Sequence, residues 1–359
     1  MALNNNYRIF YAIQQIAFAK EGWAAAGNFK EAHGVQSVGI TTTFNLEQAF
    51  ELGQLAIYEN IEGIPDIEVT IEKVLDGYPP IYCLATRGAS NTTLTGRQNT
   101  KTMAALTIFR DTVDQADGST GRLSECFMSG LYVSSVGYTF PVDGNATESV
   151  TLVGNNKLWR SAAVAGGFDG TDAPNASTGV MRREDLSFDY TGNSVESITG
   201  GPSVIHNGST GTILPTDIDG ISSSGTNDIF AGTRIYKAHI QNISCSTDLG
   251  REQLFELGRK GAYYRYVTFP VEVTTEFTVI ATSGDMVNAK EEEDNLLHQK
   301  IVIRTAEGLS IDAGKKNKLA SVGMSGGDAG GDNVELTYTY TNFNDFAIDH
   351  THADAKTTA

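Results

Sequence analysis

The stretch EQAFELGQLAIYENIEGIP, residues 47–65, returns as EQLFELGRKGAYYRYVTFP at residues 252–270. The two copies align without a gap at a constant offset of 205 residues. Both contain FELG, at 50–53 and at 255–258, and both end in proline. Such self-similarity predicts that the chain contains two related structural modules.

The match extends beyond the repeated phrase. Gln36 matches Gln241 at the same offset, and after one deletion IEVTIEKV at 67–74 aligns with VEVTTEFT at 271–278. Weaker similarity continues to SVG, which starts at Ser135 and again at Ser321. Each module therefore spans on the order of 110 residues, consistent with an internal duplication.

We expect a short helix inside each copy of the phrase. Asn45 is a suitable N-cap with Gln48 three residues later, and Gly53 and its counterpart would end the helix with positive φ. On this interpretation Phe50 and Phe255 occupy equivalent buried sites. The residues predicted to form the core of the repeat or contacts around a ring are Phe50, Leu52, Gly53, Phe255, Leu257 and Gly258.

Beyond the proline the sequence alternates with a period of two. Apolar residues at Ile67, Val69 and Ile71 alternate with Glu68, Thr70 and Glu72, and the second copy alternates in the same way through Glu272, Thr274 and Glu276. This pattern indicates half-buried strands. We predict a mainly β protein with short helices, built as two similar antiparallel β-sandwich or barrel modules.

The predicted modules occupy residues 1–154 and 237–359, the second with a flexible C-terminal tail. Residues 155–236 are rich in Gly, Ser, Thr and Asn and are expected to form a surface insertion. Apolar residues within this insertion would order it in part, for example Trp159, Phe188, Tyr190 and Ile213. A separate third domain is the alternative interpretation.

Composition limits the classes of function. The 359 residues include 26 Lys and Arg against 43 Asp and Glu, a formal net charge of −17, which opposes attraction to nucleic-acid phosphates or anionic lipids. The chain lacks a secretory leader pattern and an apolar run of the ~18 residues that a spanning helix needs, so we expect it to stay in the cytosol where it is made. Cys83, Cys126 and Cys245 are expected to be buried thiols.

Motifs that resemble catalytic signatures lack the necessary context. GMSGG at 323–327 fits G-x-S-x-G, but a Gly-rich stretch follows, so Ser325 is expected at a hairpin tip and not at a nucleophile elbow. GLSIDAGKK at 308–316 has the wrong spacing for a phosphate loop. DHTH at 349–352 is expected to lie in a frayed tail. We therefore expect no enzyme activity and no catalytic, cofactor-binding or metal-binding residues.

The runs GVQSVGITTTFNLEQAFELGQLAIYENIEGIPDIEVTIEKVLDG and VSSVGYTFPVDGNATESVTLVGNNKLW resemble the tail tube proteins and related virion proteins of tailed bacteriophages. The resemblance implies stacked rings of β-sandwich subunits whose inner strands close a barrel around a channel for genome ejection. Tubes with one module per chain form hexameric rings, so a duplicated chain would form a pseudo-sixfold ring from three copies. The middle insertion departs from this pattern.

The resemblance also implies partners and location. The protein would assemble with itself and with other tail proteins: a sheath if the tail contracts, the tape measure, the terminator and the baseplate. DNA would pass transiently and without specific binding, no membrane insertion is expected, and the virion tail would assemble in the host cytoplasm. The alternatives are a baseplate or hub component and, more distantly, a carbohydrate-binding adhesive β protein.

An acidic channel wall agrees with the net charge, because basic contacts would hold the duplex through counterion release. The candidate lumen residues are Glu68, Glu72, Glu272 and Glu276. Exposure on the outer surface is the alternative for these side chains.

Overall fold

The computed structural model describes residues 9–22, 28–53, 55–109, 122–161, 179–183, 186–188, 203–206, 239–281, 287, 289, 291, 301–305, 307–327, 331 and 333–355. The protein is mainly β with a few short helices and antiparallel sheets, as the alternating patterns predict. Within these residues, no helix has the length and apolarity needed to cross a membrane.

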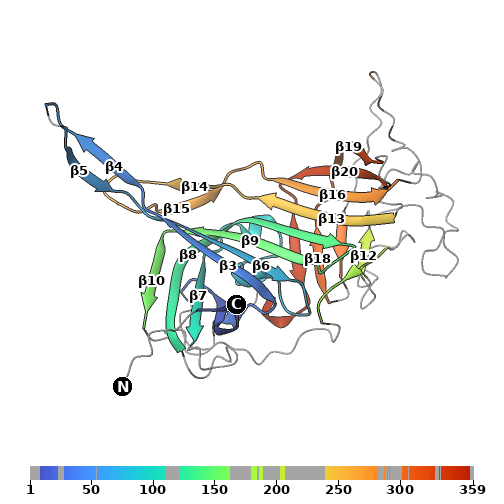
Figure 1. The fold of residues 1–359 in the computed structure, drawn as a ribbon, viewed down its shortest axis with the longest axis horizontal. Helices are drawn as coiled ribbons and strands as arrows, with labels where there is room; N and C mark the ends of the chain where they lie inside the picture. Colours follow the sequence, from blue (N-terminus) through green and yellow to red (C-terminus); the bar gives the residue numbers. More distant parts are fainter. Residues whose placement is uncertain are drawn as a thin grey trace.

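One large sheet dominates the fold (Figure 1). Its central strands, called here the main sheet, run in the order β3-β6-β9-β8-β13-β16-β20-β19. Their bounds are β3 Val35–Thr43, β6 Asp66–Val74, β8 Arg122–Pro141, β9 Thr147–Gly154, β13 His239–Asp248, β16 Glu272–Ile280, β19 Lys318–Gly326 and β20 Val334–Phe343. The first half of the main sheet is thus β3-β6-β9-β8 and the second is β13-β16-β20-β19.

The two halves share their strand register, including its irregularities. Gln36 in β3 and Gln241 in β13 are each the extra residue of a bulge, and Ser134 in β8 and Ala320 in β19 form a second equivalent pair of bulges. Counted from these bulges, Glu68 in β6 is equivalent to Thr274 in β16. The sequence alignment of β6 with β16 was therefore wrong by two residues, a shift that leaves every side chain on the same face.

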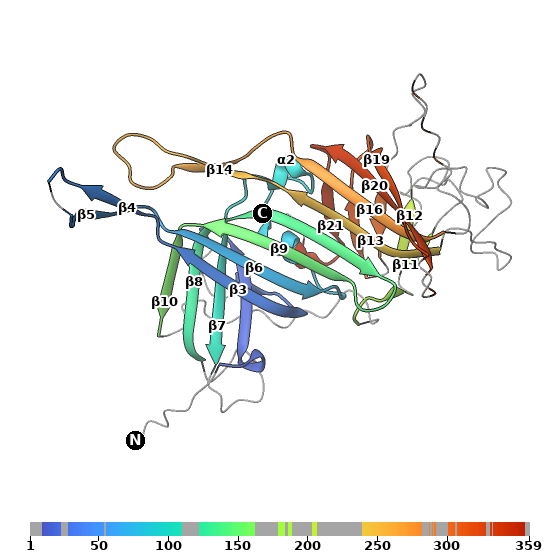
Figure 2. The ribbon, with the colours of Figure 1, turned by 45° about the horizontal axis from the view of Figure 1, so that its top comes forward.

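The repeated phrase forms two β-hairpins, so the predicted helix is wrong. Hairpin β4–β5 comprises Leu46–Phe50 and Ile57–Glu62, and hairpin β14–β15 comprises Arg251–Leu254 and Tyr264–Val267. Both leave the same end of the main sheet (Figures 1 and 2). A helix of two or three turns is marginal without a packed face, whereas here each strand gains cross-strand hydrogen bonds in an identical register.

The turn glycines behave as predicted, but the aromatic residues do not. Gly53 and Gly258 have φ of +92° and +85°, a region that L side chains rarely adopt. Phe50 and Phe255 lie beside them and are 67% and 58% exposed. Both side chains are exposed, so the prediction that they are buried is wrong, because a projecting hairpin tip has no second layer against which to pack.

The second layer lies beneath the main sheet (Figure 2). The first part of β8 continues into a sheet with β7 Thr102–Phe109, β1 Gln14–Lys20, β2 Lys30–Glu31 and β10 Asn156–Arg160. A separate sheet contains β11 Leu186–Phe188, β12 Ser203–His206, β17 Val302–Arg304, β18 Leu309–Asp312 and β21 Ala347–His350. The helices are α1 Ile81–Ala85 and α2 Leu94–Arg97, with 3-10 turns at Tyr11–Ile13 and Ala353–Ala355.

One core cluster joins both halves. It combines Val69 and Val150 from the first half with Val273 and Tyr338 from the second, and it extends to Ile348 in β21. The halves therefore share one core. Within it, α1 contacts β1, β8, β9 and β21.

The segment that follows β21 is packed as far as Ala355, the last described residue, so the prediction that residues 349–352 are frayed is wrong. His350 and His352 are buried, and Ala355 belongs to the core cluster. Asp354 forms ion pairs with Lys30 at 3.1 Å and with Arg87 at 3.6 Å. Apolar burial and these ion pairs hold a segment whose polar sequence suggested fraying.

The described parts of the predicted insertion include strands and a buried residue. Trp159 lies in β10, Phe188 lies in β11, and Met181 is fully buried. Tyr190 and Ile213 lie outside the described residues. The segment therefore contributes strands to two sheets.

The cysteine prediction is confirmed, since Cys83, Cys126 and Cys245 are all buried free thiols. Burial raises the pKa of Cys83 to about 12 and that of Cys245 to about 11.

Candidate assembly surfaces

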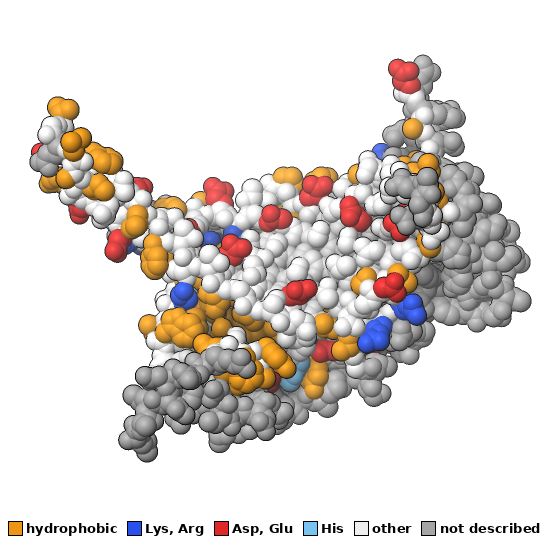
Figure 3. Space-filling view, viewed as in Figure 1, with side chains coloured by type: hydrophobic (Ala, Val, Ile, Leu, Met, Phe, Trp, Pro, Cys, Tyr) orange, Lys and Arg blue, Asp and Glu red, His pale blue; other side chains and the backbone are white. Residues whose placement is uncertain are grey.

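The face of the main sheet that points away from the core is mainly polar. One row of cross-strand partners runs across it through Ser37, Glu72, Ser149, Gly137, Ser246, Thr274 and Thr341. In Figure 3 the centre of this face shows few apolar side chains and separate carboxylates. We call it the polar face. Short uncharged side chains interspersed with acids form a smooth and net negative surface.

All four candidate lumen residues lie on the polar face. Glu68 and Glu72 in β6 and Glu272 at the start of β16 are exposed. Glu276 is half-buried and accepts a hydrogen bond from Thr339 Oγ1 at 3.3 Å. The alternation that predicted these strands is confirmed, and whether the polar face lines a channel stays a prediction.

Hairpin β4–β5 carries apolar side chains into solvent (Figure 3). The exposed set is Leu46, Phe50, Leu52, Leu55, Ile57, Tyr58 and Ile61. Contiguous apolar surface on a projection is typical of a contact site for another chain. The six predicted repeat residues, three in each copy of FELG, lie on the two hairpin tips, and their role in ring contacts stays a prediction.

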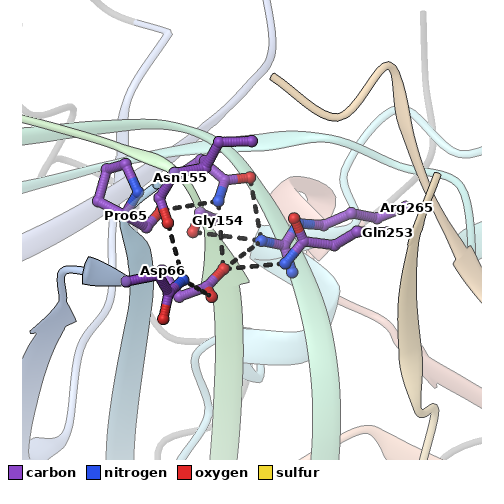
Figure 4. A network of polar contacts seen from close by, with 8 residues as sticks. Pro65, Asp66, Gly154, Asn155, Gln253 and Arg265 are labelled. Atoms are coloured by element: carbon purple, nitrogen blue, oxygen red, sulfur yellow. Dashed lines mark hydrogen bonds and ion pairs between the residues drawn. The ribbon is translucent and has the colours of Figure 1, made fainter. Parts of the chain in front are cut away.

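Hairpin β14–β15 differs because Arg265 anchors it to the first half (Figure 4). Its Nη2 donates to Asp66 Oδ1 at 3.2 Å and to Asn155 Oδ1 at 3.0 Å, while Gln253 Nε2 donates to the same Asp66 oxygen at 2.9 Å. Burial acts to raise the pKa of Asp66, but hydrogen bonds from Asn45, Gln253 and Arg265 outweigh it and hold that pKa below its usual value. The carboxylate is therefore ionised at neutral pH and stabilises the seated hairpin.

A second cation, Arg251, fixes the base of the same hairpin. Its Nε donates to the Val133 carbonyl oxygen at 2.7 Å and its Nη1 to the Gln98 carbonyl oxygen at 2.5 Å. The guanidinium lies 5.1 Å from the centroid of the Tyr132 ring, and the Tyr264 ring lies 6.1 Å from the same centroid. Burial lowers the pKa of Arg251 to about 10, so it remains charged at neutral pH.

These anchoring residues were not among the predicted sites. Leu46 and Asn60 occupy the positions of Arg251 and Arg265 in hairpin β4–β5. The available signal was Arg265 in the tyrosine-rich run YYRYV, an arginine at a position that strand alternation places on the buried side. Sequence alone did not show which distant carboxylate it meets.

The internal seam of the main sheet, where β8 pairs with β13, contrasts with its two outer edges. At the seam Val136, Tyr138, Ile243 and Cys245 are all buried. Among the described residues β3 pairs only with β6, and β19 pairs only with β20. Within this part of the chain, both outer edges are therefore a template for another strand.

Two residues from the motifs that resemble catalytic signatures lie at exposed turns. Ser325 is exposed at the end of β19, next to Gly326 and Gly327 with positive φ, as expected of a hairpin tip. Lys315 is exposed in the turn after β18. Within the described residues no group of three or more His, Cys, Asp or Glu side chains is placed to hold a metal ion.

Comparison with known proteins gives little further guidance. The scan against protein-family models and the search of curated protein sequences found no match. Among solved structures, a chain of the anti-feeding prophage baseplate is similar with a TM-score of 0.32 and 9% identity, covering 43% of this chain and 96% of that chain. A chain of the anti-feeding prophage tube-terminating cap has a TM-score of 0.32 and 13% identity, covering 45% and 100%. Both similarities are too weak to assign a function.

Proposed function

We propose that the protein is a structural subunit of a phage-type tail, a tail tube protein whose copies form stacked rings around a channel for genome delivery. The observation that carries this proposal is the main sheet itself. Its halves have the same strand order and register and join edge to edge at β8–β13, while among the described residues no further strand pairs with the equivalent edges at β3 and β19. This supports the predicted internal duplication and provides two complementary edges on one chain.

Complementary edges on opposite sides favour a closed ring. The contact joins two different surfaces, so each added copy presents the same open edge again until a rotation closes the assembly. Closure removes every exposed edge of the sheet. Three copies, each contributing two halves, would give the pseudo-sixfold ring.

The polar face supports the orientation of the sheet within that ring. With the core cluster on one side, the polar face is the side free to line a channel. Within a Debye length of about 8 Å at physiological salt, its carboxylates would repel DNA phosphates. The duplex would then slide without the attachments that a basic wall makes.

Electron microscopy of the purified full-length protein tests this proposal. We expect rings or short tubes with an axial channel and, in a reconstruction, the polar face toward the channel. A protein that stays monomeric at high concentration would refute the tube assignment. Single rings that do not stack would instead indicate the hub or baseplate role.

A further inference from the structure

We infer that β19 of one copy pairs antiparallel with β3 of the next copy in the register that β8 and β13 adopt within the chain. This inference rests on the proposed ring and names its seam. The partner is a second copy of this chain, and the seam places Ser321 of one copy directly opposite Thr43 of the other.

The internal seam supplies the register. Asp248 in β13 pairs with Ser135 in β8, and Ser246 pairs with Gly137 two residues further on. Ser321 follows the β19 bulge as Ser135 follows the β8 bulge.

The second strand of the seam transfers in the same way. Thr43 is the β3 residue equivalent to Asp248, because the bulges at Gln36 and Gln241 align the two strands. Transferring the Asp248–Ser135 pair to the outer edges therefore brings Thr43 of one copy to Ser321 of the next.

Burial at the two edges agrees with this pairing. Ile243 and Cys245 are buried by the internal seam, whereas their equivalents Val38 and Ile40 are only half-buried. On the other edge Tyr138 is buried, and its equivalent Met324 is 67% exposed.

In the transferred register Met324 lies opposite Ile40 on the core side of the sheet. The new seam therefore covers apolar atoms that the isolated chain leaves open, which favours association.

The same transferred register places hairpin β4–β5 against the next copy. Tyr264 of hairpin β14–β15 lies against Tyr132 of β8, and the equivalent residues are Glu59 of hairpin β4–β5 and Lys318 of β19. Between copies, an aromatic contact is thus replaced by a carboxylate facing an ammonium. This complementary charge would give hairpin β4–β5 a contact on the neighbouring copy.

Cysteine pairs test the register. The full-length variant Thr43→Cys/Ser321→Cys, oxidised after assembly, should form covalent multimers on a denaturing gel. A link within one chain is excluded because β3 and β19 lie at opposite edges, roughly 30 Å apart at ~4.8 Å per strand. The native thiols are buried and their raised pKa values suppress exchange.

Two control variants make the result specific. Ser135→Cys/Asp248→Cys should form the equivalent link within one chain and migrate as a monomer. Thr41→Cys/Ser321→Cys, displaced by two residues on the same face, should form several-fold fewer multimers, because a disulfide needs Cβ atoms about 3.5–4.5 Å apart.

The outcomes separate the register from the tube assignment. Multimers of the Thr43 pair in excess over the Thr41 pair support the inference. Rings that form while the Thr41 pair links better, or while neither pair links, overturn this register and leave the proposed function standing. Absence of any ring in the unmodified protein overturns both.

Discussion

The two halves of the main sheet share a register but differ in the side chains that they bury at equivalent positions. Lys73 and Glu148 are opposite one another in β6 and β9, and both are fully buried. The equivalent pair in the second half is Val279 and Leu336, which are also buried. The same backbone position thus holds charged groups in one half and aliphatic groups in the other.

The difference arises from what packs beneath each half. Glu148 accepts hydrogen bonds from the backbone N–H groups of Ile81 at 2.6 Å and Tyr82 at 3.1 Å, at the start of α1, and from the Tyr138 hydroxyl at 2.8 Å. Burial nevertheless raises the pKa of Glu148. The carboxyl group is kept in the core because a helix end needs acceptors for its first N–H groups.

The largest expected effect comes from giving the first half the residue of the second. Glu148→Leu should lower the free energy of unfolding by about 3–5 kcal/mol, because the helix N–H groups and the Tyr138 hydroxyl lose their acceptor and Lys73 loses a nearby carboxyl group. Urea unfolding measures it. Glu148→Gln, which keeps an acceptor oxygen, should cost less, and Leu336→Met in the second half should cost under about 1.5 kcal/mol. Equal losses in all three variants would contradict the capping role.

The next effect separates the two hairpins. Arg265→Ala should destabilise the protein by about 1–3 kcal/mol, since Asp66 and Asn155 lose a buried partner. Hydrogen exchange of residues 251–267 should rise toward that of residues 46–62. The matched variant Asn60→Ala should change neither quantity in the unassembled chain. If exchange in 251–267 stayed slow without Arg265, the aromatic contacts and Arg251 alone would suffice to seat the hairpin.

A smaller effect depends on pH and concerns the segment that follows the second half. Burial, with His352 and Lys73 nearby, lowers the pKa of His350 to about 3. Because this folded-state pKa is below the ordinary histidine value of 6.5, the contribution to stability is complete above pH 6.5 and is lost as the pH falls toward 3. Uptake of one proton changes the free energy of unfolding by at most ~1.4 kcal/mol per pH unit.

Unfolding measured between pH 7 and 5 tests this expectation. His350→Asn should reduce the dependence of the free energy of unfolding on pH, because asparagine does not titrate. Its side-chain oxygen keeps an acceptor near the His352 N–H, which donates to His350 Nδ1 at 3.1 Å. His33, whose pKa burial also lowers, should supply the remaining slope. An unchanged slope in the variant would show that His350 has the same pKa in the folded and unfolded protein.

The smallest effect on stability is expected on the polar face. Glu68→Lys/Glu72→Lys in the first half, and Glu272→Lys/Glu276→Lys in the second, should each change the free energy of unfolding by roughly 0.5 kcal/mol or less. In assembled tubes both should slow DNA passage, most strongly at low salt. The location of the four side chains in a reconstruction decides the point: an outward position would remove the channel argument for them.

Local sequence determined the strands and their faces. The period-two pattern in residues 67–72 identified β6, its polar face and its buried face, because successive side chains in a strand point to opposite sides whatever the strand pairs with. The repeat likewise predicted that Gln36 and Gln241, or Gly53 and Gly258, occupy equivalent positions. These properties depend only on neighbours in the chain.

Tertiary structure decided everything that depends on distant partners. FELG reads equally well as the end of a helix, and only the pairing of β4 with β5 made it a hairpin tip. Arg265 meets Asp66 across 199 residues, His350 is buried although its sequence is that of a polar tail, and Glu148 is kept by a helix that no strand pattern reveals. Sequence period encodes which way a side chain points, whereas the packing of remote segments determines what it meets there.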